Sequence, residues 1–243
     1  MANKYETLKQ MINECHNIVV FSGAGISVPS GIPDFRSAQG IYNQKGNYSV
    51  SPEEIVSHSF FYSNTEEFYK FYKDKMCYPK AEPNAAHKYF ADLEKKGKNV
   101  IVVTQNIDGL HQKAGSSMVY ELHGTIHQNF CQKCGRLFGL DYVMNAKGIP
   151  YCDKCGGVVK PDVVLYEEGL DQDVLRRSIE AISNAELLII AGTSLRVFPA
   201  AGLVNYFRGK YIVVINKEPL YLYDTVALEI NEPVGEVFSQ LHI

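Results

Sequence analysis

The sequence has no tryptophan, no apolar run long enough to cross a membrane and no excess of one charge. Its longest apolar runs, Leu187–Ala191 and Tyr211–Ile215, are far shorter than the ~20 residues that a transmembrane helix needs. The 24 lysines and arginines nearly balance 27 aspartates and glutamates, whereas nucleic-acid-binding domains are usually strongly basic. We therefore expect neither a membrane nor a nucleic-acid partner.

The first residues also lack the apolar core of a secretory signal peptide. Apolar residues make up 46% of the chain, which is too many for a disordered protein. A length of 243 residues suggests one large domain with a smaller insert. We expect a cytoplasmic, monomeric protein.

Short apolar segments alternate with helical patterns along most of the chain. Asn17–Phe21 and Asn99–Val103 are largely apolar runs, as expected for strands that are buried on both faces. The alternation predicts an α/β fold in which helices cover both faces of a parallel sheet. Further strands are expected over Met118–Leu122, Asp162–Tyr166, Glu186–Ala191, Tyr211–Ile215 and Val226–Ile230, and helices over Lys4–Cys15, Ala85–Lys96, Gln172–Ser183 and Pro199–Phe207.

Two stretches interrupt this alternation. Residues 39–80 are aromatic and polar, and we expect a long loop followed by one or two helices there. Residues 127–162 contain four of the six cysteines, spaced as Cys131-x2-Cys134-x17-Cys152-x2-Cys155. In a chain without a secretory signal, this spacing is typical of a tetrahedral zinc site, and four thiolates leave no open position for catalysis. We predict an inserted zinc ribbon with one structural ion; four unrelated buried thiols are the alternative.

Glycine-rich and polar loops follow the predicted strands. Parallel sheets bind ligands at the edge formed by the carboxyl ends of their strands, so these loops should meet there. Gly23-Ala24-Gly25 could let the backbone approach a pyrophosphate. A simple tight turn is the alternative, because Val28 stands where the full dinucleotide fingerprint has its third glycine.

Charged and imidazole groups follow in the next loops. Arg36 could bind a phosphate, with Asp34 orienting it and Phe35 closing over a planar ring; a rigid turn with a surface salt bridge is the alternative. His123 precedes Gly124 at a strand end, which suits a general base, although a histidine in a turn is commoner. Polar residues also follow three of the predicted strands, and they could recognise a ribose, a phosphate or an amide, or they could simply form turns. These groups are Gln105, Asn106 and Asp108; Gly192, Thr193 and Ser194; and Asn216 and Lys217.

Taken in order, these motifs resemble those of sirtuins, which are NAD-dependent protein lysine deacylases. The resemblance covers residues 10–240 and implies a Rossmann-type NAD domain in 1–38, 81–126 and 163–243, a cofactor loop and helical insert in 39–80 and the zinc ribbon in 127–162. It rests on Gly23-Ala24-Gly25-Ile26-Ser27, Gly31-Ile32-Pro33-Asp34-Phe35-Arg36, Thr104-Gln105-Asn106-Ile107-Asp108-Gly109-Leu110-His111, His123-Gly124, the four cysteines, Gly192-Thr193-Ser194-Leu195 and Asn216.

The resemblance also implies where NAD binds. The residues expected at the cofactor are Ala24, Phe35 and Arg36, with Gln105 at the ribose, Asn106, Ile107 and Asp108 in the nicotinamide pocket, and Thr193, Ser194, Asn216 and Ile230 at the adenosine half. We add to this predicted set Gly23, Gly25, Val28, Asp34, His123, Gly192 and Lys217.

The implied reaction transfers an acetyl group from lysine to ADP-ribose and consumes NAD as a co-substrate. The acyl oxygen attacks the anomeric carbon as nicotinamide leaves, and His123 then acts as general base through a ribose hydroxyl. His123 and Asn106 are the predicted catalytic residues.

Acetylated lysine proteins or peptides are the expected partners, lying in a cleft between the NAD domain and the ribbon. The peptide would pair with Val163–Tyr166 and Leu195–Val197 as an added strand, although Glu167 stands where many relatives have glycine. Sirtuins that prefer succinyl or malonyl lysine carry a Tyr-x-x-Arg pair, whereas Tyr69-Lys70-Phe71-Tyr72 has no arginine, which favours deacetylation. The predicted substrate residues are Val163, Leu165, Leu195 and Val197.

Two other functions are compatible with the same motifs. A mono-ADP-ribosyltransferase would share the cofactor and the ribosyl intermediate, but His123 and an apolar acyl site favour deacylation. A non-catalytic NAD-sensing zinc scaffold would bind NAD without releasing nicotinamide.

Overall fold

The structure, a computed structural model, describes residues 3–43, 48–222 and 225–241. These residues contain a six-stranded parallel sheet in the order β3-β2-β1-β7-β8-β9. This order confirms the predicted Rossmann-like sheet, in which ligands bind where the strand order reverses, here between β1 and β7. The strands are β1 (Asn17–Ser22), β2 (Asn99–Thr104), β3 (Val119–Glu121), β7 (Leu187–Ala191), β8 (Tyr211–Ile215) and β9 (Leu228–Ile230).

The central strand β1 shows why its sequence is a continuous apolar run. Successive side chains of a strand point to opposite faces of the sheet. Ile18 and Val20 therefore pack into the core on one face, and Val19 and Phe21 pack into the core on the other. With both faces covered, an alternating apolar and polar pattern would bury polar groups, so the run is continuous.

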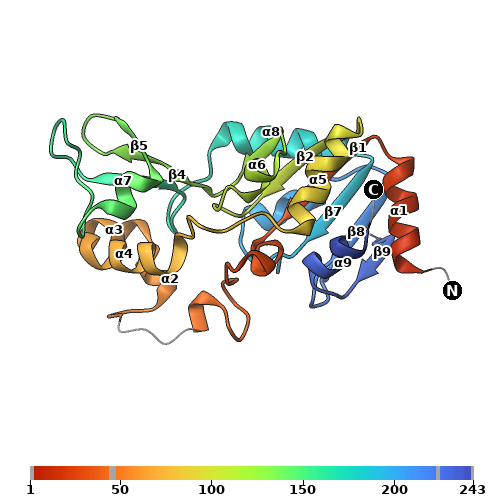
Figure 1. Cartoon of the computed structure of the whole chain (residues 1–243), viewed down its shortest axis with the longest axis horizontal. Helices are drawn as coiled ribbons and strands as arrows, with labels where there is room; N and C mark the ends of the chain where they lie inside the picture. The colour runs from red at the N-terminus through yellow and green to blue at the C-terminus, as the bar shows by residue number, and fades with distance from the viewer. Residues whose placement is uncertain (1–2, 44–47, 223–224, 242–243) are drawn as a thin grey trace.

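Helices cover both faces, as predicted (Figure 1). α1 (Lys4–Glu14), α5 (Ala85–Lys95) and α9 (Val234–Gln240) share the core that contains Ile18 and Val20. α8 (Gln172–Asn184) and η5 (Ala200–Tyr206) share the core that contains Val19 and Phe21. The helix expected over Pro199–Phe207 is the 3-10 helix η5, which Pro199 precedes as the N-cap residue. Among the described helices, none combines the length and the apolar character of a membrane span.

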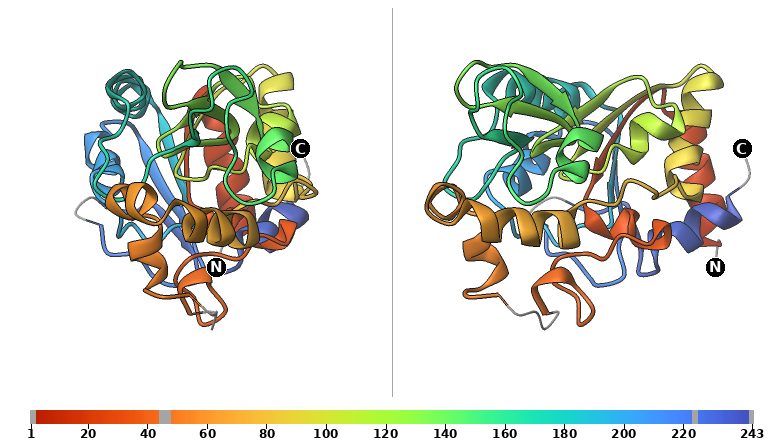
Figure 2. Two further views of the ribbon diagram at one scale, coloured as in Figure 1. Left: turned by 90° about the vertical axis from the view of Figure 1, so that its left-hand side faces the viewer. Right: turned by 60° about the vertical axis from the view of Figure 1, so that its left-hand side comes forward.

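Most of the remaining elements form a second lobe, at the left of Figure 1 and away from both chain ends. The exceptions include α6 (Leu110–Ala114), which packs against α5, and η1 (Ala24–Ile26), which packs against α9. A small antiparallel sheet in the order β5-β4-β6 packs beside the helices of the insert. Figure 2 shows these helices lying below the small sheet. The elements are α2 (Pro52–Ile55), α3 (His58–Ser63), α4 (Thr65–Phe71), the π-helix η4 (Tyr72–Met76), β4 (Gly124–Cys131), β5 (Leu137–Gly139), α7 (Leu140–Asn145) and β6 (Val159–Val163).

We call this second part the small lobe, and the six-stranded sheet with its helices the large lobe. The helical insert and the zinc ribbon, which the sequence suggests as separate modules, share one apolar core. Phe61 and Phe68 of the helices pack in it with Phe138 and Val159 of the ribbon. The two interruptions, which are separated by the 46 residues 81–126 of the sequence, thus stabilise each other.

The strand predicted over Asp162–Tyr166 begins and ends earlier. β6 spans Val159–Val163 and pairs with β4 in the small antiparallel sheet, not with a strand of the parallel sheet. Tyr166 lies beyond it and pairs with the helical insert instead: its N–H donates to Val56 O at 3.0 Å, and its carbonyl oxygen accepts from His58 N at 2.9 Å. An apolar run predicts a buried extended segment but not the neighbour with which it pairs.

Candidate active site

A cavity of about 230 Å³ lies where the two lobes meet. Its walls come from the loops after β1 and β2, from the end of β6 and the chain that follows it, and from residues 197–199. The loops after β1 and β2 and the residue His123 therefore converge as predicted, whereas Asn216 and Lys217 do not line the cavity. The predicted site residues that line the cavity are Ala24, Phe35, Arg36, Gln105, Asn106, Ile107, Asp108, His123, Val163, Leu165 and Val197.

His123 lies between β3 and β4, at the point where the chain passes from the large to the small lobe. Its Nδ1 is 2.9 Å from the carbonyl oxygen of Gln105. A carbonyl oxygen can only accept, so Nδ1 carries the proton, and Nε2 of the neutral ring keeps its lone pair. Burial lowers the pKa of His123, more than the bond to Gln105 raises it. His123 is thus a neutral base at pH 7.

Asn106 and Asp108, which also line the cavity, are held by Ser27. The Ser27 hydroxyl donates to Asp108 Oδ2 at 2.7 Å and accepts from Asn106 Nδ2 at 3.1 Å. Because the hydroxyl proton is used on Asp108, the atom of Asn106 that faces Ser27 must be the NH2 group, which fixes the orientation of the amide. Burial raises the pKa of Asp108 despite these donors. The arrangement presents an oriented amide and a carboxyl group to the cavity.

A buried polar network behind Asn106 was not predicted from the sequence. Ser22 and Thr104 are in register at the ends of β1 and β2. Ser22 Oγ lies 2.9 Å from Thr104 Oγ1 and 3.1 Å from His111 Nε2, and Thr104 Oγ1 accepts from Asn106 N at 3.0 Å. The signal available in the sequence was a hydroxyl residue at the last position of these two strands.

His111 belongs to this network and His87 packs against its ring, and neither imidazole carries charge. Their rings lie 4.8 Å apart between centroids, and both side chains are buried. Burial lowers the pKa of His87 to about 4 and that of His111 well below its usual range. Both imidazoles are therefore neutral, and they serve as hydrogen-bonding groups.

The turn Gly23–Gly25 packs against the loop after β7. Gly25 N donates to Gly192 O at 2.8 Å. A Cβ at Gly25 would lie 2.8 Å from Gly192 Cα, and one at Gly23 would lie 2.7 Å from Thr193 Cβ. Glycine is needed at both positions because two backbones touch, in addition to any role beside a phosphate.

The other predicted residues do not line the cavity. Thr193 Oγ1 accepts from Gln105 Nε2 at 2.9 Å and so positions Gln105. Asp34 Oδ1 accepts from the backbone of Arg36 at 3.1 Å, which shapes the loop. Leu195 is half-buried with a φ of 50°. Ile230 is fully buried in the core, Asn216 Nδ2 donates to Glu218 O, and Val28, Ser194 and Lys217 are exposed.

The four cysteines of the ribbon converge in the small lobe. Their Sγ atoms all lie within 4.8 Å of one another. Sulfur atoms bound to zinc at ~2.3 Å in a tetrahedron are about 3.8 Å apart. The Cys131–Cys155 and Cys134–Cys152 Sγ pairs are separated by 3.4 and 3.7 Å. The cluster fits one structural zinc ion that is closed to substrates.

Comparisons with known proteins agree with this geometry. The family model described as "Sir2 family" matches residues 23–199. The chain is 53% identical to an NAD-dependent protein deacetylase of Clostridium perfringens, over 99% of both chains, and 52% identical to one of Clostridium acetobutylicum, over 98% of both.

Solved structures give the same result. A structure of Sir2 with a p53 peptide and NAD+ superposes with a TM-score of 0.84 at 38% identity, covering 98% of this chain and 97% of that one. A structure of Sir2 with a deacetylated p53 peptide and 3′-O-acetyl ADP-ribose gives a TM-score of 0.86 at 39% identity, covering 98% and 96%. The chain belongs to the Sir2 family, the sirtuins.

Proposed function

We propose that this chain is an NAD-dependent protein lysine deacetylase. It transfers the acetyl group from a lysine side chain to ADP-ribose and releases nicotinamide, so NAD is a co-substrate. The observation that carries the proposal is the pairing of a neutral His123, whose Nε2 is free to accept a proton, with an oriented Asn106 in one cavity. Relatives whose names state the same activity are about half identical over nearly the whole chain.

Each cavity residue has a defined task in this reaction. NAD supplies an electrophilic anomeric carbon and a nicotinamide leaving group. Asn106, Ile107 and Asp108 surround the space assigned to nicotinamide, with the amide and carboxyl groups held by Ser27. His123 Nε2 takes the proton of a ribose hydroxyl, and the Gln105 carbonyl stabilises the imidazolium that forms.

The peptide lies between the lobes, with its acetyl-lysine in the apolar part of the cavity. Val163, Leu165 and Val197 line this part. Sir2 structures with acetylated and propionylated peptides support the choice of substrate. Tyr69 and Tyr72 are fully buried in the small-lobe core, so the predicted position of a carboxylate-binding arginine has no cation. Acetyl-lysine is therefore favoured over succinyl-lysine.

The remaining sequence predictions belong to this proposal. We retain the division of the chain at 38/39, 80/81, 126/127 and 162/163, with the zinc ribbon as a stabilising module. We also retain the monomeric state, the cytoplasmic location and the lack of nucleic-acid and membrane partners as predictions.

Mass spectrometry of an acetyl-lysine peptide incubated with the protein and NAD tests the proposal. Deacetylation predicts a peptide that has lost its acetyl group, together with acetylated ADP-ribose and one nicotinamide per turnover. A mono-ADP-ribosyltransferase would give a peptide that has gained ADP-ribose. A non-catalytic scaffold would bind NAD and release no nicotinamide. Either of the last two results would overturn the proposal.

A further inference from the structure

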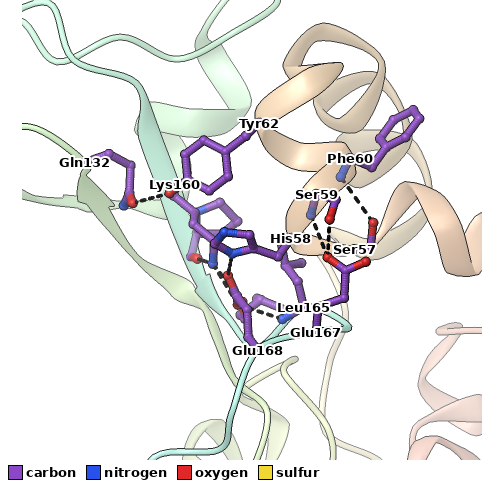
Figure 3. A network of polar contacts seen from close by, with 12 residues as sticks. Ser57, His58, Ser59, Phe60, Tyr62, Gln132, Lys160, Leu165, Glu167 and Glu168 are labelled. Carbon is purple, nitrogen blue, oxygen red and sulfur yellow. Dashed lines mark hydrogen bonds and ion pairs between the residues drawn. The ribbon is translucent and has the colours of Figure 1, made fainter.

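The chain after β6 makes a tight turn that is fixed to the small lobe. Glu168 N donates to Leu165 O at 3.0 Å, and Glu167 has a φ of 74°. A left-handed residue at this place in a turn is usually glycine. Here the Glu167 carboxylate accepts from the backbone and the hydroxyl of Ser59, at 2.8 and 2.5 Å, and these bonds hold the strained residue in place (Figure 3).

Glu168 fixes the same turn from its other side. Its Oε2 accepts from Leu165 N at 2.9 Å and lies 3.2 Å from Lys160 Nζ, while its Oε1 lies 2.9 Å from His58 Nδ1 (Figure 3). The Tyr166 backbone is bonded to Val56 and His58 as described above. Tyr166 is therefore held at the corner of a turn that has little freedom to move.

The side chain of Tyr166 reaches the loop that carries Phe35. Its hydroxyl lies 3.2 Å from the hydroxyl of Tyr42 and accepts from Arg36 Nη2 at 3.4 Å. The Arg36 guanidinium lies over the Tyr42 ring, 5.5 Å from its centroid. Burial raises the pKa of Tyr42, and the bond to Tyr166 raises it further. The Tyr42 hydroxyl therefore stays protonated at neutral pH, and its contact with Tyr166 is a hydrogen bond.

Tyr42 in turn fixes Phe35. Tyr42 N donates to Phe35 O at 3.0 Å, and their rings meet edge to face with 5.4 Å between centroids. Phe35 and Arg36 line the cavity on the side assigned to NAD, whereas Leu165 lines it on the side assigned to the peptide. Through its hydroxyl, Tyr166 joins these two sides.

We propose that the Tyr166 hydroxyl is a positioning group that couples peptide binding to NAD binding. The inference rests on the proposed function. A peptide seated between the lobes fixes the small lobe, and the rigid turn bonded to it, against the large lobe. The Tyr166 hydroxyl on this turn then holds Tyr42 and Arg36 in the position that lets Phe35 cover the dinucleotide. Because coupling between two sites is reciprocal, NAD binding strengthens peptide binding by the same factor.

The test is calorimetric titration of an acetyl-lysine peptide with and without saturating ADP-ribose, which resembles NAD but cannot react. We expect ADP-ribose to tighten peptide binding to the wild type about fivefold, as for one ordinary hydrogen bond. Tyr166→Phe, which removes only the hydroxyl, should lower this factor to about one. Tyr42→Phe should have the same effect, and the double variant should add nothing, because the two hydroxyls form one contact.

Tyr62→Phe is the matched control. Its hydroxyl donates to Gln132 Oε1 at 3.0 Å within the small lobe, so its loss should leave the factor unchanged (Figure 3). A wild-type factor of one, or an unchanged factor in Tyr166→Phe, would overturn the inference even if the enzyme deacetylates peptides. A wild type that releases no nicotinamide would instead overturn the proposed function.

Discussion

The two lobes are stabilised in different ways. In the large lobe, β1 lies between β2 and β7, and apolar cores cover both faces of the sheet. In the small lobe, the strands β5 and β6 have only three and five residues. Its core combines aromatic rings of the insert with residues of the ribbon, which include Cys131 and Cys152. We therefore expect burial of apolar surface to suffice for the large lobe and the small lobe to depend on a metal ion as well.

The two lobes also supply different residues to the cavity. The large lobe supplies Asn106 and Asp108, at the end of a buried strand, while Val163 and Leu165 come from the small lobe and the turn after it. His123 lies on the connection between the lobes. The side of the cavity that we propose for the nucleotide therefore belongs to the large lobe, and the side that we propose for the peptide belongs to the small lobe and the turn after it.

Removal of zinc should have the largest effect and should separate the lobes. Structural zinc contributes ~10 kcal/mol or more to the folding of small domains. Chelation, or Cys152→Ser, should abolish activity and hydrogen-exchange protection in β4–β6 while β1 and β7 remain protected. An unchanged melting temperature and unchanged protection after verified metal loss would show that the small lobe does not need the ion.

Gly25→Ala should weaken the large lobe without affecting zinc content. The added methyl group would meet the backbone of Gly192, which cannot move aside as a side chain can. We expect a loss of about 2–3 kcal/mol in unfolding free energy, measured by urea denaturation. Gly139→Ala in the small lobe is the control, because its added Cβ meets no atom within 4 Å. Equal effects of the two substitutions would contradict the close contact of the loops.

Acid should destabilise the large lobe through its neutral histidines. The pKa of His87 falls to about 4 in the folded protein, whereas an unfolded histidine titrates near 6.5. Below pH 6.5 the unfolded chain therefore binds more protons, and stability decreases as the pH falls. His87 alone should cost ~2 kcal/mol between pH 7 and pH 5. His87→Leu should reduce this pH dependence; an unchanged slope in denaturation at the two pH values would refute the assignment.

The smallest effects are expected at the two cysteines outside the zinc cluster, one in each lobe. Cys15 lies in the large-lobe core and Cys77 in the small-lobe core. Burial raises the pKa of both thiols, that of Cys77 to about 12, so neither should react with a thiol reagent in the folded protein. Each Cys→Ser variant should lose about 1 kcal/mol of stability and retain activity. An inactive variant would reveal a function for that thiol.

The same contrast explains how much the sequence could predict. The parallel sheet of the large lobe could be predicted from its apolar runs, because a strand that is buried on both faces needs an unbroken apolar run such as that of β1. The zinc ligands follow from their spacing. The common core of the helical insert and the ribbon could not be predicted, because residues such as Phe61 and Phe138 share it through long-range packing that leaves no local sequence pattern. For the same reason, the position of β6 and the contact of Tyr166 with Tyr42 required coordinates.

His123→Ala is the most direct test of the central claim that this imidazole, set between the lobes, is the general base. The measurement is the rate of acetylated ADP-ribose formation from an acetyl-lysine peptide at saturating NAD, with NAD affinity and zinc content determined on the same samples. We predict a rate at least ~100-fold below wild type, with affinity and zinc content preserved. A variant that forms the product at the wild-type rate would contradict the account.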